Sequence, residues 1–417
     1  MTQPLYTLAT SFLAPVVGAW LALRPRYWPL LRRFNPPAPS FPVRPLWIHA
    51  CSVGEVRTVQ PILDALHKRW PEIPVVLTVS TVTGYEVART LPTQHTLTWF
   101  PFDHPLVVRR FIRRLAPRAL VLIETELWPA VIVQAHRTGV PIAVLSGRLS
   151  DRHYARYRRA RFFWRPLLKQ ITVAAMQEER YAERIIDLGV PPDRVHVTGN
   201  AKFDGLTMQP EPALRASIAS ENGFTPDQPI LLFGSTRPGD EALAASCWRV
   251  LRERFPTLCI VIAPRHLDRI SQALEPFDEP VRLRSQVKEG RAPAGERVFF
   301  LDTLGELSRF YALATVAVIG GSFYPGVEGQ NPLEPAALGI PTVFGSRMRN
   351  FDGPARLLLD RRGACQVSGP DALCAQLEVL LNDETLCGEM GGRAQEVIRE
   401  NQGAIDRSLD LLSALLT

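Results

Sequence analysis

The stretch WIHACSVGEVR, Trp47 to Arg57, passes from an apolar run to a turn of small residues and then into an amphipathic segment. The apolar run predicts a buried strand, and Ser52 and Gly54 predict the tight turn that ends it. Beyond the turn, apolar residues recur with the spacing of a helix that packs one face on a sheet: Val56, Val59, Ile62, Leu63 and Leu66.

Glu55 lies on this turn. Ligands of open α/β sheets bind at the carboxyl ends of the strands, so a carboxylate in this position is a candidate functional group. An acidic residue in the first turn of a helix also interacts favourably with the helix dipole. That interaction is the purely structural interpretation of Glu55.

Short apolar runs alternate with helical segments through the first half of the chain. This alternation predicts a parallel sheet with helices on both faces. We therefore predict a Rossmann-like first domain, although its sequence lacks the G-x-G-x-x-G fingerprint. The further predicted strands are residues 73–79, 97–101, 119–123, 141–145, 173–176 and 195–197.

Two acidic residues follow the predicted strand 119–123 in the segment ETELWP, Glu124 to Pro129. If the strand continues, Glu124 and Glu126 share one of its faces. Three roles stay open: a catalytic or substrate-binding role for Glu124, a metal site formed by the pair, and structural hydrogen bonding. Divalent cations that prefer oxygen need more ligands than this pair offers, so we predict no metal site.

A polar stretch with two prolines, residues 208–214, predicts a linker between domains. Lys202 lies just before it and is a candidate binding residue, although most lysines are simply solvated. After the linker the alternation of strands and helices restarts, with strands predicted at 230–233 and 259–263. The second half is therefore predicted to be another α/β domain.

Glycine-rich turns follow two predicted strands of the second domain. The turn 234–241 opens a helix, and backbone amides at such a helix start bind phosphate. Gly320 and Gly321 end the strand that begins at Val316, and residues 331–335 (NPLEP) open the next helix. A glycine loop lets backbone approach a phosphate, and a carboxylate such as Glu334 can accept both hydroxyls of a ribose. We predict a sugar-nucleotide site here.

The N-terminal 23 residues carry no charged side chain, and arginines follow at 24, 26, 32 and 33. This apolar length is marginal for crossing a bilayer, and the basic flank places the rest of the chain on the cytoplasmic side. We predict an uncleaved membrane anchor or a monotopic insertion. A cleaved signal peptide and a buried helix are the alternatives.

The net charge of +7 over 417 residues indicates an anionic partner. Residues 148–169 interleave arginines with aromatic residues, a pattern typical of helices that lie on anionic bilayers or bind phosphates. Nucleic acid is another possible partner, and a solvated helix with inward aromatics is the structural alternative. Because the N-terminal segment is apolar, we favour an anionic membrane surface as the partner of residues 148–169, and we predict no nucleic-acid partner.

The six cysteines are scattered singly, without a C-x-x-C pair. This distribution predicts reduced thiols rather than disulfides.

Several short motifs, in one order along the chain, resemble those of the 3-deoxy-D-manno-octulosonic acid (Kdo) transferases of lipopolysaccharide biosynthesis. They are SVGE at 52–55, TVTG at 81–84, ETELWP at 124–129, GNAKFD at 199–204, PRH at 264–266, LGEL at 304–307 and NPLEPAA at 331–337. Two positions depart from the family pattern: Arg237 and Gln330 stand where the family usually has histidine.

The resemblance implies an inverting GT-B glycosyltransferase: an α/β protein with two Rossmann-like domains whose parallel sheets face a central cleft. Its implied parts are a membrane-anchor helix with a basic flank at 1–33, an acceptor-binding domain at 34–207 and a linker at 208–214. A CMP-sugar-binding domain at 215–402 and a C-terminal helix at 403–417, which returns to the first domain, complete the chain.

The resemblance also implies the substrates and the site. CMP-Kdo would be the donor and the lipid A precursor (lipid IVA) the acceptor, without cofactor or metal, on the cytoplasmic side of the inner membrane. Glu55 would be the general base, and Glu124 and Lys202 would assist in the transition state. The implied CMP site comprises Pro264, Arg265, Leu304, Gly305, Glu306, Asn331, Pro332, Leu333 and Glu334.

Two alternatives stay open at this point. One is a GT-B enzyme that uses another sugar nucleotide, such as a UDP-sugar transferase or an epimerase. The other is a non-catalytic, membrane-docked nucleotide-binding protein. The presence of both Glu55 and Lys202 favours an enzyme over the second alternative.

Overall fold

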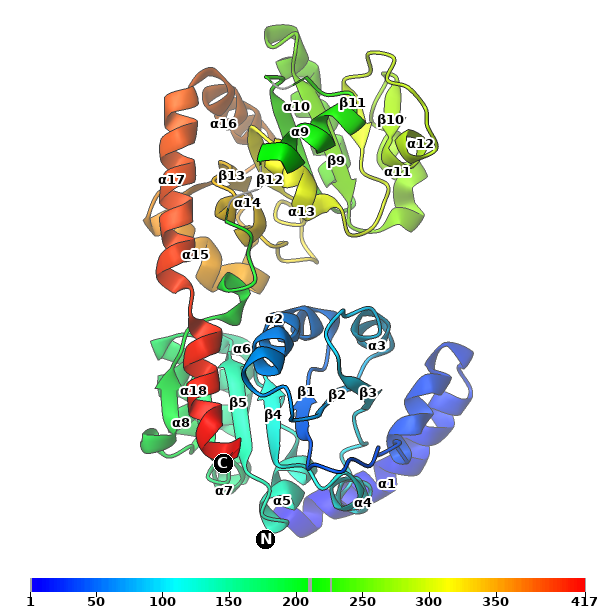
Figure 1. Ribbon diagram of the computed structural model, residues 1–417, viewed down its shortest axis with the longest axis vertical. Coiled ribbons are helices and arrows are strands. Elements are labelled where there is room, and N and C mark those ends of the chain that lie inside the picture. The colour runs from blue at the N-terminus through cyan, green and yellow to red at the C-terminus, as the bar shows by residue number, and fades with distance from the viewer. Residues whose placement is uncertain (1, 209–211, 226, 417) are drawn as a thin grey trace. The chain divides into compact units, whose positions relative to one another are not determined.

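The computed structural model describes residues 2–208, 212–225 and 227–416. It divides into two compact units (Figure 1): unit 1 contains Met1–Gly205 and Asn401–Thr417, and unit 2 contains Leu206–Glu400. Each unit is built on one seven-stranded parallel sheet, which confirms the predicted α/β class. Part of the predicted linker, residues 209–211, lies outside the described residues.

The sheet of unit 1 has the strand order β3-β2-β1-β4-β5-β6-β7. Strands β2 and β3 follow β1 on one side of it, and β4 lies on the other side of β1. The order of the strands therefore reverses between β1 and β4. The strands are β1 (Leu46–His49), β2 (Val75–Val79), β3 (Thr96–Trp99), β4 (Ala119–Ile123), β5 (Ile142–Gly147), β6 (Val173–Met176) and β7 (Val195–Val197).

Helices cover both faces of this sheet, as the continuous apolar strands predict. Trp47 of β1 belongs to the core under α4, α5, α7 and α8, whereas its neighbours Leu46 and Ile48 belong to the core under α2 and α18. The helices are α1 (Thr2–Ala22), α2 (Val53–Arg69), α3 (Val82–Ala88), α4 (Pro105–Leu115), α5 (Pro129–Arg137), α6 (Asp151–Arg159), α7 (Arg161–Leu168), α8 (Glu179–Leu188) and α18 (Ala404–Leu416), with short 3₁₀ turns η1 (Pro25–Phe34), η2 (Pro192–Arg194) and η3 (Ala201–Phe203).

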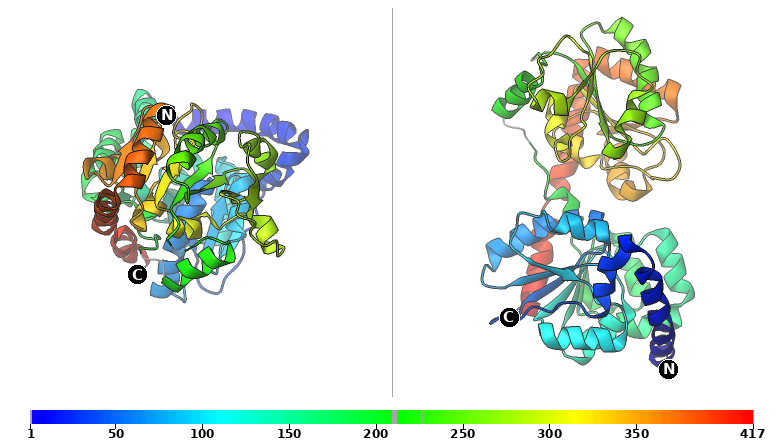
Figure 2. Two further views of the ribbon diagram at one scale, coloured as in Figure 1. Left: turned by 90° about the horizontal axis from the view of Figure 1, so that it is seen from above. Right: turned by 90° about the vertical axis from the view of Figure 1, so that its right-hand side faces the viewer.

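The N-terminal helix α1 runs along the outside of unit 1 (Figure 2). Its Ser11 hydroxyl lies 3.0 Å from Nε2 of His104, at the start of α4. Among the described helices, none combines the length and the apolar character that crossing a bilayer requires.

The C-terminal helix α18 packs in the same core as α2. Asp204 fixes its first turn, because Oδ1 accepts the backbone N–H of Gly403 at 2.7 Å and Oδ2 accepts that of Ile405 at 2.5 Å. These amides are among those that a helix start leaves without an intrahelical partner. One carboxylate thus holds the last helix of the chain on unit 1.

The sheet of unit 2 has the order β10-β11-β9-β8-β12-β13-β14, so the reversal lies between β8 and β12. Its strands are β8 (Ile230–Thr236), β9 (Cys259–Pro264), β10 (Val281–Leu283), β11 (Val298–Phe300), β12 (Val316–Ile319), β13 (Thr342–Phe344) and β14 (Ala364–Gln366). Its helices are α9 (Pro212–Glu221), α10 (Asp240–Arg254), α11 (Ile270–Leu274), α12 (Arg284–Lys288), α13 (Leu307–Phe310), α14 (Leu333–Ala337), α15 (Asp352–Asp360), α16 (Pro370–Asn382) and α17 (Glu384–Asn401), with 3₁₀ turns η4 (Leu267–Arg269), η5 (Tyr311–Leu313) and η6 (Arg349–Phe351).

The prediction of six reduced thiols is wrong at one pair. Cys247 on α10 and Cys374 on α16 form a disulfide, with their Cα atoms 5.2 Å apart. They are separated by 127 residues in the sequence, so only the packing of α16 beside α10 brings them together. Cys51, Cys259, Cys365 and Cys387 are free thiols.

We predict that Asp204→Ala destabilises unit 1 by about 1–2 kcal/mol, the usual cost of removing a helix cap. Denaturant unfolding followed by circular dichroism measures this loss. Asp193→Ala, at an exposed aspartate of the same unit, is the matched control and should leave the unfolding midpoint unchanged. Equal stability of the Asp204 variant and the native protein would contradict the assigned cap.

Candidate active site

Glu55 lies in the first turn of α2, directly after β1, at the strand reversal of unit 1. The residue is buried, with 8% of its surface exposed. Oε2 accepts the backbone N–H of Cys51 at 2.7 Å, and Oε1 accepts the Ser52 hydroxyl at 2.9 Å. The sequence therefore holds the carboxylate at the carboxyl end of β1, as predicted, and fixes its orientation through the turn that precedes it.

Burial is the main cause that raises the pKa of Glu55, to about 8, and the charges of Glu126 and Glu124 add to it. Hydrogen bonds from Cys51 and Ser52 act in the opposite direction. A carboxyl group with such a pKa exchanges its proton near neutral pH, which suits a general base.

Glu126 stands beside Glu55. The Cys51 thiol and one carboxylate oxygen each of Glu55 and Glu126 lie within 4.8 Å of one another. The indole Nε1 of Trp128 donates to Glu126 at 2.9 Å, and burial raises the pKa of Glu126. These three groups are close enough to bind a common metal ion.

Glu124 points to a different partner. The strand β4 ends at Ile123, and Glu124 takes a left-handed backbone conformation with φ 56°. The condition for Glu124 and Glu126 to share a strand face is therefore not met. Instead, Glu124 Oε1 lies 3.0 Å from Nζ of Lys202 on η3, and each side chain is about one fifth exposed. The structure thus pairs two predicted residues that are 78 positions apart.

Arg33, in η1, belongs to the basic flank of the N-terminal segment, and its sequence context predicts no role in the site. Its Nε donates to the backbone oxygen of Phe100 at 3.1 Å, and its guanidinium lies 5.8 Å from the centre of the Trp128 ring. Its positive charge lowers the pKa values of Cys51 and Glu126, against the larger effect of burial. The N-terminal segment thus supplies a cation next to the buried carboxylates.

Tyr6 of α1 is a second contribution of the N-terminal segment. Its hydroxyl donates to Asp103, and Asp103 accepts the backbone N–H groups of Ala130 and Val131 at 3.2 and 3.0 Å. This chain of contacts ties α1 to the start of α5, immediately after the ETELWP segment. No local sequence pattern marks Tyr6 or Asp103, because they meet only in the folded unit.

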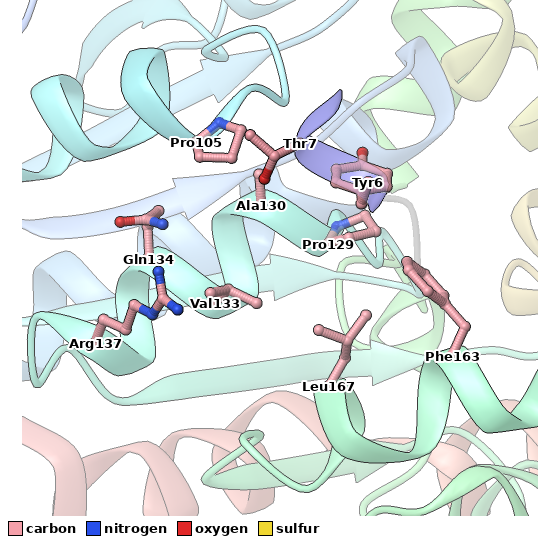
Figure 3. Close-up of a pocket in the computed structure, with 10 residues that line it drawn as sticks. All are labelled: Tyr6, Thr7, Pro105, Pro129, Ala130, Val133, Gln134, Arg137, Phe163 and Leu167. Carbon is pink, nitrogen blue, oxygen red and sulfur yellow. The ribbon is translucent and has the colours of Figure 1, made fainter. Parts of the chain in front are cut away.

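A small pocket, partly open to solvent, lies where α1 meets α5 and α7 (Figure 3). Apolar side chains predominate in its lining, and Arg137 and Gln134 lie at one side. The lining residues are Tyr6, Thr7, Pro105, Pro129, Ala130, Val133, Gln134, Arg137, Phe163 and Leu167. Neither Glu55 nor Lys202 lines it.

The predicted CMP-site residues lie at or beyond the carboxyl ends of strands of unit 2. Pro264 and Arg265 stand at the end of β9, and the backbone N–H of Arg265 donates to Thr236 at 3.0 Å. The segment 304–306 follows β11, and the segment 331–334 follows the loop after β12. These strands are parallel and lie close together in the order β11-β9-β8-β12, so the predicted residues belong to the same edge of the sheet.

Asn331 and Glu334 are held together locally. Asn331 Nδ2 donates to Glu334 Oε1 at 3.0 Å, and Asn331 Oδ1 accepts the backbone N–H of Leu333 at 3.1 Å. Pro332 precedes the first residue of α14, which begins at Leu333. This arrangement fixes one carboxylate at the start of the helix.

Glu306 has strong partners inside unit 2. Although burial raises its pKa, hydrogen bonds from Arg284, Thr303 and Lys288 lower it to about 2. Arg284 Nη2 and Lys288 Nζ each lie 3.0 Å from a carboxylate oxygen of Glu306. By contrast, Leu304 is 78% exposed and Gly305 has a φ of 82°, so these two form an open turn before α13.

Over 90% of its length the chain shares its fold with the crystal structure of a glycosyltransferase from Rickettsia africae, with a TM-score of 0.62. Their sequences are only 10% identical, and the match covers 90% of this chain and all of that one. The fold defines the class: a two-domain α/β protein of the GT-B-like type.

Sequence comparison specifies the family. Residues 28–205 match the family model of the 3-deoxy-D-manno-octulosonic acid transferases. The transferase of Haemophilus influenzae is 31% identical, over 90% of this chain and 88% of its own. That of Bordetella pertussis is 33% identical over 99% of both chains. The protein therefore belongs to the Kdo transferase family of glycosyltransferases, which confirms the resemblance seen in its motifs.

With Glu55 in the role of general base that the resemblance implies, we predict that kcat/KM falls about tenfold per pH unit as pH decreases below about 8, because Glu55 becomes protonated. Glu126→Gln deletes a neighbouring negative charge and should move this inflection to lower pH by about one unit. A pH profile of initial rates measures both effects. Glu72→Gln, at an exposed glutamate of the same unit, should leave the inflection in place. An unmoved inflection in the Glu126 variant would contradict the coupling of the two carboxyl groups.

Proposed function

We propose that this protein transfers Kdo from CMP-Kdo to a hydroxyl group of the lipid A precursor, with inversion at the anomeric carbon. Family membership supports the type of reaction. The observation that carries the proposal is the buried carboxylate of Glu55, which the Cys51 and Ser52 hydrogen bonds hold at the strand reversal of unit 1 and whose pKa burial raises to about 8. A sugar hydroxyl is a weak nucleophile, and a positioned base that accepts its proton accelerates attack about 10²–10⁴-fold.

The other predicted residues have complementary tasks in this proposal. Lys202, held by Glu124, supplies a positive charge that stabilises negative charge developing in the transition state. Arg265 and the segments 304–306 and 331–334 bind the CMP part of the donor in unit 2. In this proposal the carboxylate of Glu334, which accepts a hydrogen bond from Asn331, accepts the ribose hydroxyls.

The reaction proposed here needs no metal ion. A departing phosphate is stabilised by lysine, arginine and backbone N–H groups. The group of Cys51, Glu55 and Glu126 mixes a soft thiol with hard carboxylates, whereas Mg²⁺ and Ca²⁺ favour sites made of oxygen. Activity in the presence of EDTA is therefore part of the proposal.

We also propose that α1 lies in the cytoplasmic interface of the inner membrane rather than across it. Large apolar side chains of α1 are exposed, among them Phe12 at 71% and Val16 at 65%. The neighbouring helix α4 exposes four arginines, Arg109, Arg110, Arg113 and Arg114. Exposed apolar groups beside basic ones are typical of helices that insert into an anionic interface.

The test of catalysis combines purified protein in detergent and EDTA with CMP-Kdo and a tetraacylated lipid A precursor. We expect CMP release and a product heavier by one or more Kdo residues. Glu55→Ala should lower kcat about 10²–10⁴-fold, and the matched control Glu72→Ala should retain full activity. A folded protein that forms no product from this donor and acceptor would overturn the proposal.

The test of membrane binding uses flotation with vesicles of phosphatidylethanolamine and phosphatidylglycerol. The double variant Phe12→Glu/Val16→Glu should bind at least about tenfold more weakly, because each buried apolar side chain contributes about 1.5–3 kcal/mol. Val379→Glu, at an exposed apolar residue of unit 2, is the matched control. Unchanged flotation of the double variant would exclude α1 as the membrane contact.

A further inference from the structure

Arg237 occupies a central position in unit 2 that the predicted CMP site does not include. It follows β8, at the reversal of strand order between β8 and β12. His266 follows the neighbouring strand β9, and Gly321 follows β12. Ligands of open α/β sheets bind at such reversals, so side chains that converge here face the expected ligand position.

The side chain of Arg237 connects these three strand ends. A Cβ atom added at Gly321 would lie 3.5 Å from Cγ of Arg237, so the arginine stem packs over the glycine. Its Nη1 lies 2.6 Å from Nε2 of His266. The buried Nε of Arg237 has no hydrogen-bond partner within the described part of the chain.

The contact between Arg237 and His266 defines the protonation state of the histidine. A guanidinium group only donates hydrogen bonds, so Nε2 must be the acceptor. His266 is therefore neutral, with its proton on Nδ1. Burial lowers the pKa of His266, and the charges of Arg237, Arg265 and Arg269 lower it further, whereas Asp268 raises it.

Nearby backbone donors are occupied by the protein itself. Asp240 Oδ2 accepts the N–H groups of Arg237 at 2.8 Å and of Gly321 at 2.6 Å. Glu241, next to Asp240, accepts from Thr236 and lies 3.8 Å from Arg269. These two amides, one in the turn between β8 and α10 and one in the glycine loop, are thus already bound. The glycine-rich turns predicted that backbone N–H groups bind an anion here. Because these two N–H groups are occupied, an anion must be bound more by side chains than that prediction implies.

We propose that Arg237 and His266 together bind an anionic group of the sugar-nucleotide donor. The group is either the phosphate or the sugar carboxylate. This inference rests on the proposed function, because CMP-Kdo carries both groups. On binding, Arg237 turns its N–H groups toward the anion, and Nε2 of His266 takes up a proton from solvent and donates it in a hydrogen bond. Binding therefore tightens as pH falls toward the ordinary pKa of histidine.

The experiment measures CMP binding to the full chain by titration calorimetry between pH 6 and pH 8.5, and KM for CMP-Kdo. Variants are Arg237→Met, Arg237→Lys and His266→Gln. Arg393→Met, at an arginine that pairs with Glu389 on the same surface helix, is the charge-matched control. Cytidine, which has no phosphate, serves as a neutral ligand that reports on the folded nucleoside site.

If the pair binds the phosphate, Arg237→Met weakens CMP about tenfold or more, as expected for loss of charge-assisted hydrogen bonds, and leaves cytidine unchanged. If it binds the carboxylate, CMP is unchanged and KM for CMP-Kdo rises by the same factor. In both cases Arg237→Lys is intermediate. The rise in KM for CMP-Kdo between pH 6 and pH 8.5 is smaller in His266→Gln than in the native protein, and the phosphodiester and the carboxylate of CMP-Kdo stay ionised over this range.

Two results would overturn the inference. One is an Arg237→Met variant with native affinity for both CMP and CMP-Kdo. The other is an equal loss for cytidine, which would show a purely structural role for the arginine. If the native protein does not bind CMP at all, the proposed donor is refuted. That result is distinguishable from the two above, because in both of them the native protein binds CMP.

Discussion

Every strand of a parallel sheet ends at the same edge, and this constraint determines where chemistry can occur in each unit. The loops that follow neighbouring strands must gather there, whatever their separation in the sequence. Where the strand order reverses, the two loops diverge to opposite faces and leave room for a ligand. Glu55 and Glu124 stand on the loops that diverge in unit 1, and Arg237 and Gly321 stand on those of unit 2.

Periodicity predicted most of this framework. The apolar runs 119–123 and 173–176 predicted strands β4 and β6 with their observed ends. The turn that contains Ser52 and Gly54 predicted that Glu55 follows a strand. Such patterns are local, because burial on both faces of a parallel sheet forces each strand to be apolar along its length. They carry no information on which loops meet across the sheet.

The contacts that complete the candidate sites join loops that are distant in the sequence, and no local pattern marks them. Lys202 reaches Glu124 because η3 returns to the edge of the sheet, and Arg33 contacts Phe100 because η1 packs beside β3. Arg284 is buried, although arginine side chains are mostly exposed in folded proteins. It tolerates burial because Glu221 and Glu306 neutralise it, and neither is close to it in the sequence.

The buried carboxylate also has a cost in stability, and its sign follows from linkage. The pKa of Glu55 is about 8 in the folded unit and near its ordinary value of 4.5 when unfolded, so the folded state binds more protons between these limits. Stability that is present below about pH 4.5 is therefore lost progressively as pH rises toward 8. A glutamine would fill the same space without this loss. Helix capping alone does not account for this loss, because an exposed carboxylate in the first turn would interact with the helix dipole without it.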